Sequence, residues 1–240
     1  AVDAQALSQM LDTGWIRGGL ALLLFLWFVG INILGLKFYE RTLIPLMILM
    51  FVLGAIVIIA GFSYDHQDFI AGVLAKEGRE IQSLAPEPLS FSVFLAAAAL
   101  LFSSFIGFDS IAQAGGEAKN PSRSLPLAIG LAILMVGSFY MLFTIAVYHA
   151  VPWNFIAEEA QNKDITAAGL MHYLLPPAWG VAIVTGAALA LINDLPAMLL
   201  AVSRLIFAWA EDGIFPKGLA AIHPQRNTPH RAILLSGVMA

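Results

Sequence analysis

Five long runs of mostly apolar residues dominate this chain of 240 residues. They cover residues 18–36, 42–62, 91–114, 126–151 and 179–210, and a shorter run occupies residues 232–240. About 20 apolar residues in a helix cross the hydrocarbon core of a bilayer. Residues 20–28 and 44–60 are apolar on every face, whereas the strands of a membrane barrel alternate in polarity. The sequence therefore predicts an all-α membrane protein, with the chain forming a single transmembrane domain in the lipid bilayer.

The composition agrees with a lipid environment and excludes several classes of function. Charged residues make up 12% of the chain and the mean hydropathy is +0.83, whereas about a quarter of the residues of a soluble domain are charged. The net charge of −4 leaves no basic stripe for a nucleic acid. There is no cysteine, and the five histidines lack the spacing of metal ligands. Because the chain opens at Ala1 without a methionine and stops inside an apolar run, we expect that both ends are cut.

Basic residues are distributed unevenly among the connections between the runs. The first, third and fifth connections carry most of them, namely Lys37, Arg41, Lys119, Arg123, Lys217, Arg226 and Arg231. Since basic connections face the cytoplasm, the first run should pass from outside to inside. The two long acidic connections, residues 63–90 and 152–178, should then be external. Residues 69–74 and 167–175 have helix-like periodicity, so these connections are either surface helices or ordinary solvated loops.

Small and polar residues interrupt the third run at Ser103, Ser104, Gly107 and Asp109. A membrane span interrupted in this way is typical of a discontinuous helix, whose unwound turn offers carbonyl and N–H groups to a ligand. The alternative is a continuous helix in which the serines bond to the preceding turn and Gly107 allows close packing. In that alternative Asp109 faces cytoplasmic water. The residues by themselves favour neither interpretation.

A second polar interruption lies near the middle of the fifth run, where Asn193 and Asp194 precede Pro196. The proline removes one backbone hydrogen bond and exposes a carbonyl beside a carboxylate that can hold a proton or a cation. A coupling site is one interpretation of this pattern, and a packing kink with a locally satisfied Asp194 is the other. No histidine lies near the serines of the third run to act as a base, so we expect no enzyme.

Three segments resemble the amino acid–polyamine–organocation (APC) permeases. Residues 104–126, with Gly107, Asp109 and the pattern Glu-x-x-Asn-Pro at 117–121, are similar to the sixth-helix signature of that family. Residues 203–216, followed by Thr228 and Pro229, resemble the end of the eighth helix and its following loop. Residues 32–37 are similar to the end of the fourth helix. The resemblance implies part of a LeuT-type bundle with an inverted repeat of five plus five helices, running from helix four into helix nine.

The resemblance also implies where a substrate binds, which is against the unwound part of the sixth helix. The implied site comprises Ser103, Ser104, Phe105, Ile106, Gly107 and Asp109. Ser103, Ile106 and Asp109 would face the substrate, and the backbone carbonyls of residues 104–107 would accept hydrogen bonds from its ammonium group. The half of the site that the family builds from its first helix is absent from this chain.

The implied function is secondary active transport of an amino acid or related amine by alternating access, in a cytoplasmic or plasma membrane, without covalent chemistry. The alternative is a nutrient sensor that binds an amino acid without moving it. Met50 stands where many relatives have a lysine that replaces sodium, and Pro196, Ala197 and Met198 stand where sodium-coupled relatives have hydroxyl residues. Asn193 and Asp194 are therefore the local candidates for coupling to H⁺ or Na⁺. We expect no other cofactor, and the sequence leaves the oligomeric state open.

Overall fold

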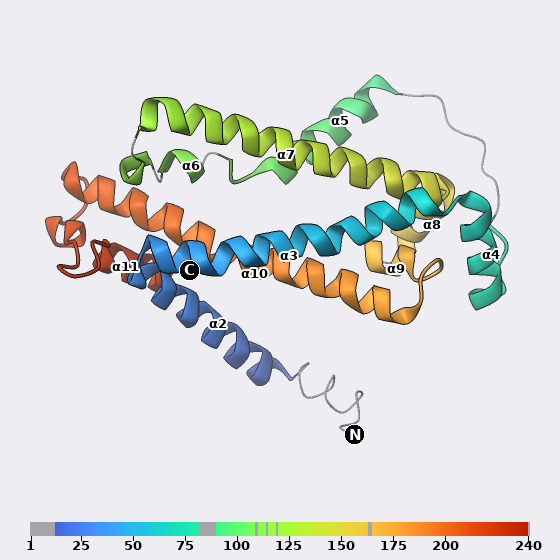
Figure 1. The fold of residues 1–240 in the computed structure, drawn as a ribbon, viewed down its shortest axis with the longest axis horizontal. Coiled ribbons are helices and arrows are strands. Elements are labelled where there is room, and N and C mark those ends of the chain that lie inside the picture. Colours follow the sequence, from blue (N-terminus) through green and yellow to red (C-terminus); the bar gives the residue numbers. More distant parts are fainter. Residues whose placement is uncertain are drawn as a thin grey trace. The chain divides into compact units, whose positions relative to one another are not determined.

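The computed structural model contains only helices, turns and irregular segments in the part of the chain that it describes, which is residues 13–81, 90–108, 110–113, 115–118, 120–162 and 165–239. This confirms the all-α fold class. The α-helices, labelled in Figure 1, are α2 (Gly14–Leu34), α3 (Leu36–Ser63), α4 (His66–Glu77), α5 (Phe91–Phe102), α6 (Ser110–Gln113), α7 (Pro121–Ala150), α8 (Trp153–Asn162), α9 (Ala167–Met171), α10 (Pro177–Glu211) and α11 (His230–Met239). The 3₁₀ helices are η1 (Ser103–Phe105), η2 (Gly115–Glu117) and η3 (Lys217–Ala220).

The contacts group the chain into two compact units. Unit 1 contains Ala1–Ile44, Ala112–Glu117 and Ile192–Ala240, and unit 2 contains Pro45–Ile111 and Ala118–Leu191. The long helices α3 and α10 each contribute residues to both units. The interruption of the third apolar run begins in unit 2, whereas the Asn193–Asp194 pair belongs to unit 1.

Five helical stretches within the described residues are long and apolar enough to cross a membrane, namely α2, α3, residues 91–113, α7 and α10. Two of the predicted connections are shorter in the structure. The first consists of Gly35 alone, which adopts a φ of +106° that a residue without a Cβ tolerates. Lys37 and Arg41, predicted to lie in this connection, therefore belong to the first two turns of α3. Helix α7 begins at Pro121 rather than at Pro126, because a proline at the first helical position lacks only an N–H that has no partner there.

The described parts of the two acidic connections form short helices within unit 2, as the helical alternative predicted. Asp65 begins α4 with a capping box, in which its side chain accepts from the backbone N–H groups of Gln67 (2.8 Å) and Asp68 (3.0 Å). The ring of Phe69 on α4 is fully buried and lies edge-on to the rings of Phe155 (5.0 Å) and Tyr173 (5.3 Å). We call α4, α8, α9 and residues 78–81 and 172–175 the acidic cap. Its buried rings join the ends of α3 and α7 in one apolar core.

An arginine holds the acidic cap together through several carboxylates. The guanidinium of Arg79 donates to Glu159 Oε1 at 2.6 Å and to Glu158 Oε1 at 3.4 Å, and lies 5.1 Å from the ring centroid of Phe155. Its Nε lies 3.6 Å from Glu77 Oε2. The hydroxyl of Tyr173 donates to Glu77 Oε1 at 2.5 Å. These contacts tie the chain that follows α4 to α8 and to the residues after α9, so the two acidic connections form one packed body.

Unit 1 is built around α2, α11 and the second half of α10. Phe28 and Val29 of α2, Leu199 of α10 and Ile233 of α11 belong to its apolar core. Asn32 is only 1% exposed, and its Nδ2 donates to the carbonyls of Phe28 (3.1 Å) and Pro196 (3.4 Å). Its buried Oδ1 has no partner within the part of the chain that the structure describes. The Asn32 side chain thus links α2 to the proline kink of α10.

Close helix approach in unit 2 depends on glycine. A Cβ built on Gly61 of α3 would collide with the backbone carbonyl of Ala146 in α7, an atom that cannot rotate away. Helices in lipid gain much of their association energy from such close contacts, because no hydrophobic effect drives them together there.

We predict that Gly61→Val lowers the free energy of unfolding by about 1–3 kcal/mol, because the added side chain must push α3 away from α7. Gly130→Val is the matched control, since a Cβ at Gly130 in α7 meets no heavy atom within 4 Å. Thermal unfolding of the complete protein in detergent measures both variants. Equal midpoints for the two variants would contradict the prediction.

We further predict that stability declines at alkaline pH through Tyr173. Burial, together with the hydrogen bond to Glu77, raises the pKa of Tyr173 to about 12 from its ordinary value of 10.0. A raised pKa in the folded state means that this stabilisation is complete below pH 10 and is lost as the pH rises from about 10 to 12. Thermal unfolding at about pH 9 and about pH 11, on either side of the ordinary tyrosine pKa, should therefore show a smaller drop for Tyr173→Phe than for the native protein. Equal drops for Tyr173→Phe and the native protein would contradict the prediction.

Candidate functional site

The interruption of the third apolar run is a genuine break in the helix. Helix α5 ends at Phe102, the 3₁₀ helix η1 follows, and the α-helical conformation resumes only at Ser110. The Ser103 hydroxyl donates to the carbonyl of Leu100 at 2.6 Å. Ile106 leaves the helical region with a ψ of 134°, and Gly107 has a φ of +111°, which favours glycine. We call residues 103–108 the helix break, and its geometry supports the discontinuous interpretation of this segment.

The backbone carbonyls of the helix break differ in their hydrogen bonding. The carbonyl of Ser103 accepts from Ile106 N–H (3.1 Å), and that of Gly107 accepts from Ser110 N–H (3.1 Å). The carbonyl of Ser104 accepts from the Tyr140 hydroxyl of α7 at 3.1 Å. Among the described residues, the backbone bonds outside the helices include none to the carbonyls of Phe105 and Ile106. Asp109, which follows Phe105 by four positions, lies outside the described residues. These two carbonyls are therefore the acceptors that the described chain leaves to a ligand or to another part of the protein.

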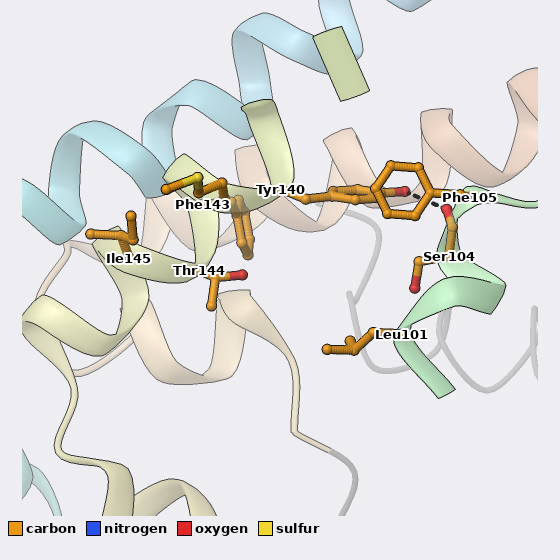
Figure 2. Close-up of a pocket in the computed structure, with 8 residues that line it drawn as sticks. Leu101, Ser104, Phe105, Tyr140, Phe143, Thr144 and Ile145 are labelled. Carbon is orange, nitrogen blue, oxygen red and sulfur yellow. Dashed lines mark hydrogen bonds between the residues drawn. The ribbon is translucent and has the colours of Figure 1, made fainter. Parts of the chain in front are cut away.

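A cavity of about 560 Å³ lies between the helix break and α7 in unit 2 (Figure 2). We call it the first cavity. Figure 2 shows the Phe105 ring beside that of Tyr140, and the Thr144 hydroxyl pointing toward Ser104 across the cavity. The two rings meet edge-on with centroids 5.6 Å apart. The lining residues are Leu101, Ser104, Phe105, Tyr140, Met141, Phe143, Thr144 and Ile145.

The structure brings some of the predicted site residues to the first cavity and not others. Ser104 and Phe105 line it, whereas Ser103, Ile106 and Gly107 shape the adjacent backbone without lining it. The Ile106 side chain is 74% exposed. Asp109 lies outside the described residues. The roles of these residues in binding a substrate stay predictions.

Tyr140 and Thr144 were not predicted from the sequence, although both contribute hydroxyl groups to the first cavity. They lie four residues apart and therefore on the same face of α7. A pair of hydroxyl residues on one face of an otherwise apolar span is the signal that marks them, because polar groups at membrane depth tend to face the protein interior.

The second candidate pair lies on α10 in unit 1. Pro196 sits inside this helix and is buried, and its missing N–H leaves the carbonyl of Ile192 without its helical donor. Asp194 is exposed, whereas the Oδ1 of Asn193 is buried and has no partner among the described atoms. The Asn32 side chain contacts the same kink through the Pro196 carbonyl. Coupling to an ion or a proton at this pair stays a prediction.

The first cavity is lined by apolar surface and by hydroxyl groups. None of its described lining residues is charged, and the hydroxyls of Ser104, Tyr140 and Thr144 have no histidine among them. Within the described ranges, no group of three or more His, Asp or Glu side chains could hold a metal ion. What the cavity offers is apolar surface, hydroxyl groups and nearby carbonyl oxygens.

Comparison with known proteins places the chain in a family. The family model described as "Amino acid permease" matches residues 3–240. The vacuolar cationic amino acid transporter 2 of Arabidopsis thaliana is 33% identical over 154 residues, which cover 64% of this chain and 23% of that protein. The branched-chain amino acid permease BcaP of Bacillus subtilis is 30% identical over 156 residues, covering 64% of this chain and 32% of that protein.

An uncharacterized transporter of Mycobacterium tuberculosis is 36% identical over 147 residues, which cover 60% of this chain and 32% of that protein. In these three relatives the matched segment is thus between 23% and 32% of the protein's own length. The family model, by contrast, covers nearly the whole of this chain, and the chain contains five helices long and apolar enough to span a membrane. The chain therefore belongs to the amino acid permease family and is part of a multi-pass integral membrane protein.

Proposed function

We propose that this chain forms part of a secondary active transporter that moves an amino acid or a related amine by alternating access. The observation that carries the proposal is the helix break. At the break, the carbonyls of Phe105 and Ile106 accept no hydrogen bond from the described residues. They lie beside a cavity of about 560 Å³, and the chain belongs to the amino acid permease family. Membrane proteins keep irregular backbone at membrane depth only where it is buried or lines a cavity.

The chemistry of the helix break fits an ammonium group. An ammonium has three N–H donors and no acceptor, so it suits a set of carbonyl oxygens. The C-terminal end of α5 at Phe102 adds the partial negative charge of its helix dipole next to the same carbonyls. The Ser104 hydroxyl supplies a further acceptor in the first cavity. In this proposal the substrate amine binds at the helix break without any covalent step, and the protein is not an enzyme.

The same geometry explains why transport requires the helix to be broken. In a continuous helix the carbonyls of residues 105 and 106 would accept hydrogen bonds from residues 109 and 110 and could not serve a ligand. Two short helical segments joined by unwound backbone also have a joint at which they can change angle. Discontinuous helices occur in transporters with alternating access, where the binding site lies near the bilayer midplane.

The coupling step in this proposal involves Asn193 and Asp194 on α10. A carboxylate within a membrane span costs roughly 2.5–3.5 kcal/mol on insertion scales, so its presence there favours a functional role. The buried Asn193 Oδ1 and the Ile192 carbonyl freed by Pro196 are oxygen acceptors on the same turns of α10. Both Na⁺ and a proton on Asp194 are compatible with such a set of oxygens.

The test of this proposal is uptake of labelled amino acids and polyamines by the complete protein in liposomes, with and without a gradient of pH or sodium. We expect saturable uptake of one substrate class. Gly107→Ala should reduce the maximal rate about 5- to 30-fold, because a side chain at a φ of +111° costs about 1–2 kcal/mol and disfavours the broken conformation. Gly130→Ala, at a helical glycine with open space around it, should leave uptake unchanged. Saturable binding without any uptake would refute transport.

We also predict that Asp194→Asn abolishes the acceleration of uptake by an imposed ion gradient while leaving substrate binding intact. The amide keeps the size of the carboxylate but can neither release a proton nor neutralise a cation. Glu40→Gln is the matched control, since Glu40 is another exposed carboxylate within an apolar helix. Initial rates of uptake at several gradient magnitudes measure the effect. Gradient dependence that persists in Asp194→Asn would exclude Asp194 from coupling.

A further inference from the structure

A second cavity lies in unit 2, among α3, α7 and α10. Its volume is about 320 Å³, and we call it the second cavity. Its walls are almost entirely apolar, and several of its lining residues are small. The lining residues that matter below are Met50 and Gly54 of α3, Tyr140 and Phe143 of α7, and Gly186 and Ala187 of α10.

The helices that line the second cavity are in tight contact with one another. A Cβ on Gly54 of α3 would lie 2.7 Å from Cζ of Phe139 on α7, and a Cβ on Gly186 of α10 would lie 2.8 Å from Cβ of Leu53 on α3. The Phe51 and Phe139 rings meet edge-on with centroids 5.0 Å apart. The three helices cannot move closer together at these points, so the space between them is maintained by packing.

The second cavity shares a wall with the first. Tyr140 and Phe143, one turn apart on α7, line both cavities. The Tyr140 hydroxyl donates to the Ser104 carbonyl of the helix break, which fixes this ring beside the proposed site of the ammonium group. A ligand whose amine binds at the helix break therefore lies next to Tyr140 and Phe143. The apolar second cavity lies on the other side of these two residues.

Neither cavity contains a charged side chain among its described lining residues. A cationic side chain placed in such a chamber would lose its hydration without gaining an ionic partner, which is strongly unfavourable. An apolar side chain would gain by leaving water for the same surface. The described walls of the two cavities therefore favour an apolar substrate side chain over a cationic one.

Building on the proposed function, we propose that the transported substrate is an amino acid with a large apolar side chain, which binds against Tyr140 and Phe143 and occupies the second cavity. The family alone does not decide this point, since the names of its members include both cationic and branched-chain amino acid carriers. The substrate class follows from the uncharged walls of the two cavities. The preference for a large side chain rests on the volume of the second cavity, which is about 320 Å³.

The experiment measures the KM for uptake of leucine, alanine and lysine by the complete protein in liposomes. We expect a lower KM for leucine than for alanine or lysine. Ala187→Leu places a bulky side chain in the second cavity and should raise the KM for leucine about tenfold or more, while the KM for alanine changes less than about threefold. Ala188→Leu is the matched control, because the neighbouring Ala188 is also exposed on α10 but does not line the cavity, and both KM values should stay at their native level.

A second variant tests the same proposal by enlarging the second cavity. Met50→Ala should lower the KM for tryptophan relative to leucine, since it removes a side chain from the wall. Met47→Ala, on the same helix but outside the cavity lining, should leave this ratio unchanged. Because this variant only removes atoms, it remains informative where Ala187→Leu fails to fold, which size-exclusion profiles in detergent detect.

The outcomes separate failure of this proposal from failure of the proposed function. Preferred uptake of lysine by the native protein would overturn the apolar substrate class and leave transport standing. An equal rise in KM for leucine and alanine in a well-folded Ala187→Leu protein would overturn the role of the second cavity. Absence of uptake of every amino acid tested would overturn the proposed function and this inference with it.

Discussion

The structure depends on the requirement that every backbone N–H and carbonyl within a lipid bilayer finds a partner. No water competes for these groups in the hydrocarbon region, so a helix is the simplest solution and each departure from it must be compensated. The helix break at residues 103–108 departs in this way, and the described chain compensates it only in part. The Tyr140 hydroxyl serves the Ser104 carbonyl, whereas the carbonyls of Phe105 and Ile106 have no donor among the described residues. The proposed binding site rests on this incompletely compensated backbone beside the first cavity.

Packing in unit 2 depends on small residues of its long helices. Gly54, Gly61 and Gly186 allow unit 2 to bring its helices into direct backbone or ring contact. The acidic cap of the same unit is stabilised by buried aromatic rings and by the ion pairs of Arg79. The charged side chains of these connections remain partly exposed to water. The apolar spans and the polar connections of one unit are therefore stabilised by different interactions.

The extent to which the site was predictable differs between backbone and side chains. Ser103, Ser104 and Gly107 identified the interruption of the third run, but the residues alone could not separate a broken helix from a continuous one. That choice depended on the φ of Gly107 and on the hydrogen bond from Tyr140, a residue 36 positions further along the chain than Ser104. Tyr140 and Thr144 were not predicted because each is a common residue in an apolar span. The role of Asn32 likewise could not be predicted, because it depends on the hydrogen bond that its side chain donates to the Pro196 carbonyl of α10.

By itself, the sequence determined that the protein lies in a membrane, that its fold is all-α and which family it belongs to, since each of these depends on local composition or on short motifs. Apolar runs long enough to cross a bilayer leave few alternatives to helices, whatever their neighbours are. Only the tertiary structure decided which described carbonyls of the helix break lack donors, which helices enclose the two cavities, and that both cavities share the wall formed by Tyr140 and Phe143. The physical reason is that these features arise from distances between residues far apart in the chain, and side-chain packing, rather than local periodicity, sets those distances.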